Sequence, residues 1–227
     1  GGPMMTLNVI VAEVLRQLHK DIEKELNAGK EKKIAIVDVL RKYIKDSKKI
    51  RFEGDGYSDD WAKEAQKRGL SNLKSTPEAL DVYTKKSTKE LFEKHKVLNS
   101  VELHARHEIE LEAFIKKVQI ESRVMGDLAL NHIIPTAILY QNKLIENANG
   151  LKGLGLDHTA AVDSIKEISK HLANLQALVH EMTEARKQLN KEDDEIKRAK
   201  GYQTKVKEAY FDTIRYEYYR DREVGFV

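Results

Sequence analysis

Residues 100–149 read SVELHARHEIELEAFIKKVQIESRVMGDLALNHIIPTAILYQNKLIENAN, and the helical pattern barely breaks along them. The apolar side chains that lie among charged ones are Ile109, Phe114, Val118, Met125, Leu128 and Ile133. At a rise of 1.5 Å per residue, a helix of roughly 48 residues spans on the order of 70 Å. Pro135 is expected to kink it, because a proline removes one backbone hydrogen bond and clashes with the preceding turn.

A second long helix is predicted over residues 158–190, from apolar residues spaced by three, four and seven. This stripe consists of Ile165, Ile168, Leu172, Leu175, Val179 and Met182. Such a pattern is typical of a bundle core or an interface and not of a cofactor site. Between the two helices, residues 147–157 contain Gly150, Gly153 and Gly155 and predict a loop.

Two long helices joined by a glycine loop usually fold back as an antiparallel hairpin. A charged break at residues 191–195 precedes a last helix, predicted over residues 195–219 and open to a break at Gly201. This last helix would pack beside the hairpin as the third helix of a bundle. The fold class is therefore predicted as mainly α, a long-helix antiparallel bundle or hairpin with a small α-rich insert.

The N-terminal part of the chain predicts two further helices. Residues 6–26 carry an apolar face at spacings of three and four, and Gly29 is suited to a left-handed cap after it. Residues 34–46 predict a second helix, rich in β-branched side chains on one side. Residues 49–53 alternate in polarity and suggest a short extended segment.

Turn and capping signals follow that segment. Gly54, Asp55 and Gly56 force a turn, and Ser58 can cap a helix that Gly69 ends. The sequence Thr76-Pro77-Glu78 then has the form of a helix start, with a capping hydroxyl, a proline in the first turn and an acid. Helices are expected over residues 76–86 and 88–95.

The composition excludes several classes of protein. Hydrophobic residues at 41%, charged residues at 34% and only 3 prolines fit amphipathic helices and not a disordered chain. A net charge of +3, with lysines interleaved among glutamates, argues against a nucleic-acid partner. The absence of cysteine excludes disulfides and zinc-thiolate sites, and no apolar run is long enough to span a membrane.

Histidines offer the first candidate chemistry. His104 and His107 are three residues apart and His95 is nearby, so a helix face here has the spacing to share a metal. The alternative is a solvated face on which histidine is simply polar, and the surrounding charged residues favour it. The sequence therefore assigns no metal ligand.

A second candidate is a polar cluster along the first long helix, formed by Glu121, Ser122, Arg123, Asp127, Asn131 and His132. Residues four apart, such as Arg123 and Asp127, can pair along one face. A satisfied polar network that steadies the helix near Pro135 is favoured over catalysis. No triad or carboxylate pair can be recognised from the spacing, so no catalytic or cofactor-binding residue is assigned.

Several linked stretches, in this order along the chain, resemble type III glutamine synthetases over about residues 1–217. They are Gly1-Gly2-Pro3 with residues 7–13, residues 52–58, residues 67–80, residues 119–140, and Asn142 with residues 144–147. The first is similar to the helix that directly follows the last active-site strand of that family. The last two resemble its C-terminal helical domain.

The resemblance implies a parent enzyme that joins glutamate and ammonia with hydrolysis of ATP and uses divalent cations, Mg²⁺ or Mn²⁺. It implies a homo-oligomer of stacked rings in a bacterial cytoplasm. The family's metal-binding glutamates and nucleotide contacts lie upstream of Gly1, so no catalytic residue carries over to this chain. The chain itself is then expected to be inactive and structural, with the rest of the enzyme and sister subunits as partners.

The domain organisation follows from that resemblance. Residues 1–50 would be closing helices of a catalytic domain, residues 51–99 a short-helix insert, residues 100–219 a C-terminal bundle and residues 220–227 an atypical tail. The alternative is a stand-alone helical-bundle interaction module that binds partner helices through the stripe in residues 165–182. If the chain is a fragment of a larger enzyme, apolar surface on residues 7–26 should be exposed. If it is a stand-alone module, its apolar side chains should fill a core of its own.

Overall fold

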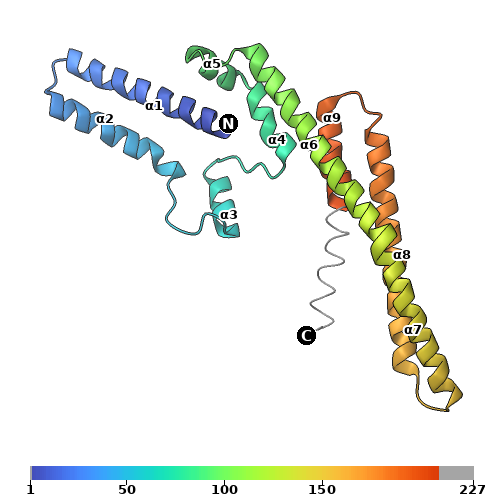
Figure 1. The fold of residues 1–227 in the computed structure, drawn as a ribbon. Coiled ribbons are helices and arrows are strands. Elements are labelled where there is room, and N and C mark those ends of the chain that lie inside the picture. Colours follow the sequence, from blue (N-terminus) through green and yellow to red (C-terminus); the bar gives the residue numbers. More distant parts are fainter. Residues whose placement is uncertain (1, 210–227) are drawn as a thin grey trace. The chain divides into compact units, whose positions relative to one another are not determined.

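The computed structural model describes residues 2–209 and separates the chain into two compact units. One unit ends at His107 and the other begins at Glu108. Both consist of helices joined by turns, and the described residues contain no strand (Figure 1). The mainly α fold class is therefore confirmed. The finer division into residues 1–50, 51–99 and 100–219 stays a prediction, and the tail 220–227 lies outside the described residues.

The first unit begins with two helices, α1 (Gly2–Asn27) and α2 (Lys32–Asp46), that lie side by side (Figure 1). Gly29 turns the chain between them with a φ of 86°, a left-handed conformation that glycine adopts without steric cost. Farther along the pair, the Tyr43 hydroxyl donates to the Asp21 carboxylate at 3.0 Å. Both predicted helices are thus confirmed, with starts a few residues earlier than expected.

The predicted extended segment at residues 49–53 is wrong at its start, because a 3₁₀ turn, η1 (Ser47–Ile50), includes Lys49 and Ile50. A lone extended segment has no neighbouring strand to satisfy its backbone, so local turn bonds form instead. Side chains then hold the following residues. Arg68 donates to the Arg51 carbonyl at 2.8 Å, and the Phe52 ring stacks on Trp61 at 4.3 Å.

The helix α3 (Asp59–Lys67) has the predicted cap and end. Ser58 accepts a hydrogen bond from the Trp61 amide at 3.2 Å, and Gly69 has a φ of 74°. In the next helix, α4 (Thr76–Leu80), the cap is Ser75 and not Thr76. Ser75 has the extended backbone that lets its hydroxyl accept from the Glu78 amide, whereas Thr76 is already helical.

The helix predicted over residues 76–86 is shorter than expected, because a 3₁₀ turn, η2 (Asp81–Thr84), follows α4 before α5 (Lys86–Lys94) begins. The Thr84 hydroxyl bonds the Asp81 carbonyl at 2.9 Å and supports this tight turn. The core of this unit joins α1, α5 and α6 (Ser100–Leu128) through the buried side chains of Val9, Phe92 and Leu103.

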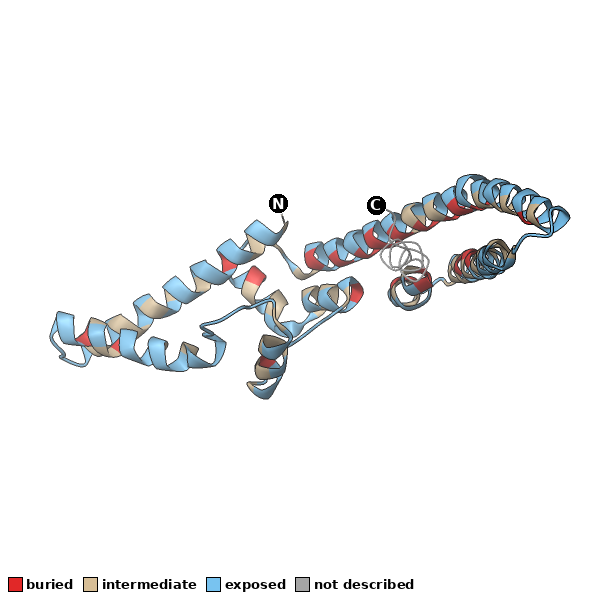
Figure 2. Ribbon diagram, turned by 90° about the horizontal axis from the view of Figure 1, so that it is seen from below, coloured by how far each residue is buried: buried red, intermediate tan, exposed pale blue. Residues whose placement is uncertain are grey.

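In the second unit the long helix changes its winding before Pro135. A π-helical turn, η3 (Ala129–Ile133), connects α6 to α7 (Ile134–Gly153). Pro135 follows this π turn directly, and the residues before it keep helical dihedral angles, so the helix meets the missing amide with a change of winding and continues. Buried residues follow one another along one side of α6 (Figure 2).

The predicted loop at residues 147–157 is too long, because α7 continues through Gly150 and Gly153. Only Gly155 takes a left-handed conformation, with a φ of 73°. The Leu156 amide bonds the Leu151 carbonyl at 2.9 Å and satisfies one of the last carbonyls of the helix. One left-handed glycine therefore suffices to reverse the chain, and the two preceding glycines remain helical.

The helix α8 (Thr159–Leu189) packs back against α7, as predicted for a hairpin (Figure 1). Ala129, Ile134, Leu175 and Val179 form a buried cluster, with Leu172 packed against it. A third member follows, formed by α9 (Glu195–Gly201) and the π turn η4 (Tyr202–Val206). Gly201 changes the winding and does not end the helix. Residues 210–219 of the predicted last helix lie outside the described residues.

Candidate interaction surface and the networks that support it

Of the three histidines considered for a metal site, two contact different carboxylates. His95 meets the Glu13 carboxylate at 2.7 Å, whereas the His107 ring is buried with its Nε2 atom 3.4 Å from an Asp81 oxygen. The rings of His104 and His107 lie 6.5 Å apart, centre to centre. Between residues 2 and 209, no three histidine or carboxylate side chains have an arrangement that would hold a metal ion.

Glu13 is the centre of a charged cluster that joins α1 to α5. Its carboxylate accepts two hydrogen bonds from Arg16 at 3.1 Å and one from Lys94 at 2.6 Å, besides its contact with His95. The Arg16 guanidinium, followed by Lys94 and His95, holds the pKa of the Glu13 carboxyl far below its usual range. Sequence spacing gave no sign of this cluster, because its partners are about eighty residues apart.

The predicted polar cluster on α6 does not converge on a site. Ser122 is buried and donates to the Gln119 carbonyl at 3.0 Å. Asn131 donates to Asp127 at 2.6 Å across the start of the π turn, while His132 is exposed. These contacts agree with a local polar network that steadies the helix near Pro135. They bring no catalytic group together.

A second network, which the sequence did not reveal, lies around Tyr202. The buried Tyr202 hydroxyl donates to Asn190 at 2.5 Å, and Gln119 donates to both Asn190 and Tyr202, at 3.0 and 3.2 Å. Burial raises the pKa of the Tyr202 phenol. The network joins α6, the end of α8 and η4, so it fixes the third member of the bundle.

The α8 stripe at residues 165–182 points inward. Leu175, Val179 and Met182 are buried, and Leu172 packs against the same core. The alternative hypothesis required this stripe to bind partner helices, and the structure assigns it to the core of its own unit. That docking prediction is therefore wrong.

Apolar side chains of α1 form an exposed stripe instead, hereafter the α1 stripe. It consists of Met4, Leu7, Val11, Val14 and Leu15, each at least 48% exposed. Their spacings of three and four place them on one side of the helix, away from the side that contains buried Val9. The exposed apolar surface predicted for residues 7–26 is thus present up to Leu15, whereas Leu18, Ile22 and Leu26 are half-buried.

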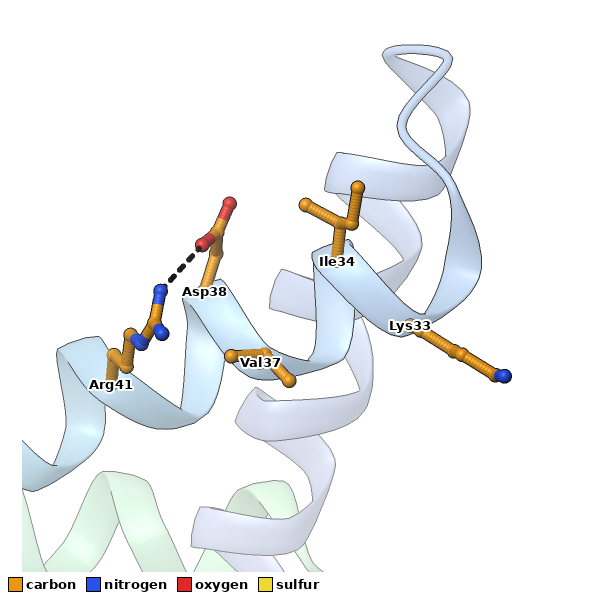
Figure 3. A pocket seen from close by; sticks show the side chains of 5 residues that line it. All are labelled: Lys33, Ile34, Val37, Asp38 and Arg41. Carbon is orange, nitrogen blue, oxygen red and sulfur yellow. Dashed lines mark ion pairs between the residues drawn. The ribbon is translucent and has the colours of Figure 1, made fainter.

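The helix α2 also has an exposed apolar side. Ile34 and Val37 line a hollow of about 280 Å³, together with Lys33, Asp38 and Arg41 (Figure 3). The Arg41 guanidinium reaches the Asp38 carboxylate at 3.9 Å. A shallow apolar floor between two cations is suited to a protein partner and lacks the enclosure of a small-molecule site.

None of the helices in the described part of the chain combines the length and the apolar character that a membrane span needs.

Comparison with known proteins identifies relatives of this chain. The family model described as the glutamine synthetase C-terminal domain matches residues 35–152. A glutamine synthetase of Bacteroides fragilis (strain YCH46) is 40% identical over 218 residues, which cover 93% of this chain and 30% of that protein. A type-3 glutamine synthetase of Dictyostelium discoideum is 34% identical over 149 residues, covering 66% of this chain and 20% of that protein.

A glutamine synthetase of Butyrivibrio fibrisolvens is 30% identical over 192 residues, which cover 81% of this chain and 26% of that protein. The chain therefore spans less than a third of the length of these curated relatives. It belongs to the glutamine synthetase family and corresponds to a C-terminal part of the type III enzymes. The resemblance found in the sequence is confirmed.

Proposed function

We propose that this chain is the C-terminal scaffold of an enzyme that ligates ammonia to glutamate with hydrolysis of ATP. The family membership supports the parent reaction, since the relatives are glutamine synthetases by name. In the parent, ATP and Mg²⁺ or Mn²⁺ would be bound by the portion that precedes these helices. Among residues 2–209 no suitable group of metal ligands is formed, so no step of the reaction is assigned to them.

The α1 stripe is the observation that carries the proposed role. Met4 is 64% exposed and Leu15 is 59% exposed, although their spacing is that of a buried helix face. Contiguous exposed apolar surface of this kind marks an interaction site. The remainder of the parent enzyme would bury this stripe, since a glutamine synthetase relative is more than three times as long as this chain.

The bundle of the second unit would supply rigidity and contacts with sister subunits. Its apolar core and the Tyr202 network connect three helical members within the unit. A homo-oligomer in the cytoplasm is the setting that this role implies. Nucleic acid and membranes are not among the proposed partners.

The first test is an assay of the chain alone. Phosphate release from ATP in the presence of glutamate, ammonia and Mg²⁺ or Mn²⁺ is expected to stay at the background rate. Release that depends on both glutamate and ammonia would overturn the proposed lack of catalysis. Correct folding is checked in the same sample by far-ultraviolet circular dichroism, which is expected to show a mainly helical spectrum.

The second test replaces the matching 218 residues of the Bacteroides fragilis enzyme with this chain. The chimera is expected to synthesise glutamine, and adding Leu7→Asp with Val11→Asp is expected to lower its specific activity at least about tenfold, because charges would enter an apolar contact. The matched control is Lys20→Gln with Lys24→Gln, which lowers the net charge by the same two units at exposed positions of α1 outside the stripe. Equal activity of both double variants would show that the stripe has no such role.

A further inference from the structure

The segment from α2 to Arg51 is the most basic surface of the described chain. Residues 30–51 contain nine lysines and arginines against three acidic residues, a net charge of +6 in a chain whose total is +3. The cations include Lys33, Arg41 and Lys45, all exposed. They accompany exposed apolar side chains, among them Ile34, so the surface is both basic and apolar.

The hollow on α2 shows how this surface would receive a partner. Ile34 and Val37 are its apolar lining, Arg41 lies beside Asp38 at one end, and the Lys33 side chain extends outward at the other (Figure 3). Asp38, the acid in the hollow, already binds the Lys30 amine at 3.2 Å and is 3.9 Å from Arg41. The Arg41 side chain is 72% exposed. A partner with carboxylates beside one apolar ring would therefore match the hollow.

The same unit displays a segment with that chemistry. Residues 53–60 contain four acidic side chains and no basic one, with Tyr57 at their centre. The Tyr57 side chain is fully exposed, and its amide bonds the Asp55 carboxylate at 2.9 Å, which fixes the turn. Asp60 is 93% exposed, and its nearest cation, Lys63, is 4.0 Å away. An exposed tyrosine at the tip of a turn is a frequent anchor of protein interfaces.

We propose that residues 53–60 of one copy dock on the basic face of α2 of a second copy. The Tyr57 ring enters the hollow over Ile34 and Val37, and Asp59 and Asp60 lie near Lys33 and Arg41. This inference rests on the proposed role in subunit assembly and names one contact of that assembly. Charge complementarity selects the occupant, because the acidic segment and the basic face are both exposed in a single copy.

The contact is heterologous, because the two surfaces differ and each copy carries one of each. Such contacts close into a ring or continue as a filament, according to the rotation between successive copies. A single contact of this size is weak, so it acts together with the other contacts of the parent enzyme. Its electrostatic part is screened by salt, which gives it a measurable signature.

Sedimentation velocity of the purified chain, over a concentration series at 50 mM and 500 mM NaCl, tests the proposal. Association is expected at low salt and is expected to weaken at high salt. Lys33→Glu with Arg41→Glu, or Asp59→Lys with Asp60→Lys, should each lower the association constant at least about tenfold. An equimolar mixture of the two double variants, and the chain that carries all four changes, should recover it, because opposite charges then face each other again.

The control is Lys143→Glu with Lys152→Glu, which changes net charge equally at exposed positions of α7. This control should associate as the unchanged chain does. Association that ignores both salt and charge reversal would overturn the contact but leave the scaffold role, since apolar stripes would then explain it. A monomer at every concentration would overturn the contact too, while the chimera assay would still decide the scaffold role.

Two further outcomes would assign the basic face to another partner. Binding to phosphatidylserine vesicles, or to duplex DNA, is measured with the same variants. Binding that is lost only in Lys33→Glu with Arg41→Glu, without any effect on self-association, would overturn the second copy as the occupant of α2.

Discussion

Helices α1 and α8 carry apolar stripes of the same spacing, yet the two stripes have different surroundings. On α8, Leu175 and Val179 are buried against α7 and η3. On α1, Leu7 and Val11 are each 55% exposed. Periodicity thus predicts which side of a helix is buried in the finished protein, but it does not show whether the same chain or another one buries it.

The difference separates two uses of one sequence pattern. The second unit buries its stripe in its own bundle, which is how a helical bundle obtains its stability. The first unit has a buried cluster around Val9, Phe92 and Leu103, yet the α1 stripe lies outside it and stays exposed. The α1 stripe is therefore expected to depend on a partner for its burial, whereas the α8 stripe is buried within its own unit.

The largest expected effect tests this contrast with two matched truncations. Leu175→Ala should lower the free energy of unfolding by about 2 to 5 kcal/mol, because it leaves a cavity in a packed core. Leu7→Ala removes the same atoms from an exposed position and should change the free energy of unfolding by less than about 0.5 kcal/mol. Urea titration followed by circular dichroism measures both. Equal losses would mean that the α1 stripe is buried in solution and would break the comparison.

A second contrast concerns Gly201 in α9 and Gly150 in α7, two helices that each adjoin a π turn. A methyl group at Gly201 would overlap the Leu189 side chain, whereas one at Gly150 would meet no atom within 4 Å. Gly201→Ala should therefore cost about 1 to 3 kcal/mol through overpacking. Gly150→Ala, inside α7, should instead stabilise by roughly 0.5 to 1 kcal/mol. Thermal melting would contradict this packing if both variants shifted the midpoint in the same direction.

A third prediction removes one hydroxyl from the second unit. Tyr202→Phe leaves Asn190 and Gln119 without their shared partner, and should cost about 1 to 2 kcal/mol at neutral pH. Tyr140→Phe, at an exposed position, is the control and should be neutral.

The pH dependence of the same variant follows from the raised pKa of Tyr202. A group whose pKa is higher in the folded state contributes stability below its unfolded pKa, near 10 for tyrosine. That stability is lost as pH rises from there through the folded pKa. The unchanged chain should therefore lose stability above about pH 10 more steeply than Tyr202→Phe. Parallel losses would show that the phenol is solvated in the folded state.

The parts of the fold that were predicted correctly depend on local chemistry. The Ser58 cap, the left-handed Gly29, the helix end at Gly69 and the bounds of α8 are each determined by a few neighbouring residues. The two π turns were not predicted, because winding is adjusted to keep the inner side of a helix in contact with distant partners. Gly150 and Gly153 were misassigned to a loop, because glycine weakens a helix without ending it and only Gly155 takes the left-handed conformation.

Among the candidate surfaces and networks, too, those formed by neighbouring residues could be predicted and those formed by distant residues could not. The α1 stripe was visible in the sequence, and only its exposure had to come from the structure. The Glu13 cluster and the Tyr202 network join residues about eighty positions apart, so no local motif could reveal them. The α8 stripe was assigned to a core or an interface, and only tertiary packing decided for the core.

The smallest expected effect concerns the charged cluster that attaches α5 to α1. Glu13→Gln removes the charge that Arg16, Lys94 and His95 share, so α5 should detach more readily from α1. The depressed pKa of Glu13 means that its contribution is present above the unfolded value, near 4.3, and is lost as pH falls from there toward the folded pKa. The difference between Glu13→Gln and the unchanged chain should therefore shrink as pH falls below about 4.

Hydrogen exchange of the α5 amides is the most direct measurement, because local opening of α5 need not unfold the second unit. Faster exchange confined to α5 and the facing turns of α1 is expected in Glu13→Gln, with the amides of α8 unchanged. Glu146→Gln, at an exposed position of α7, is the matched control and should leave both regions as they are. Faster exchange in α8 as well would mean that the two units open together, and the contrast between them would then not extend to their stability.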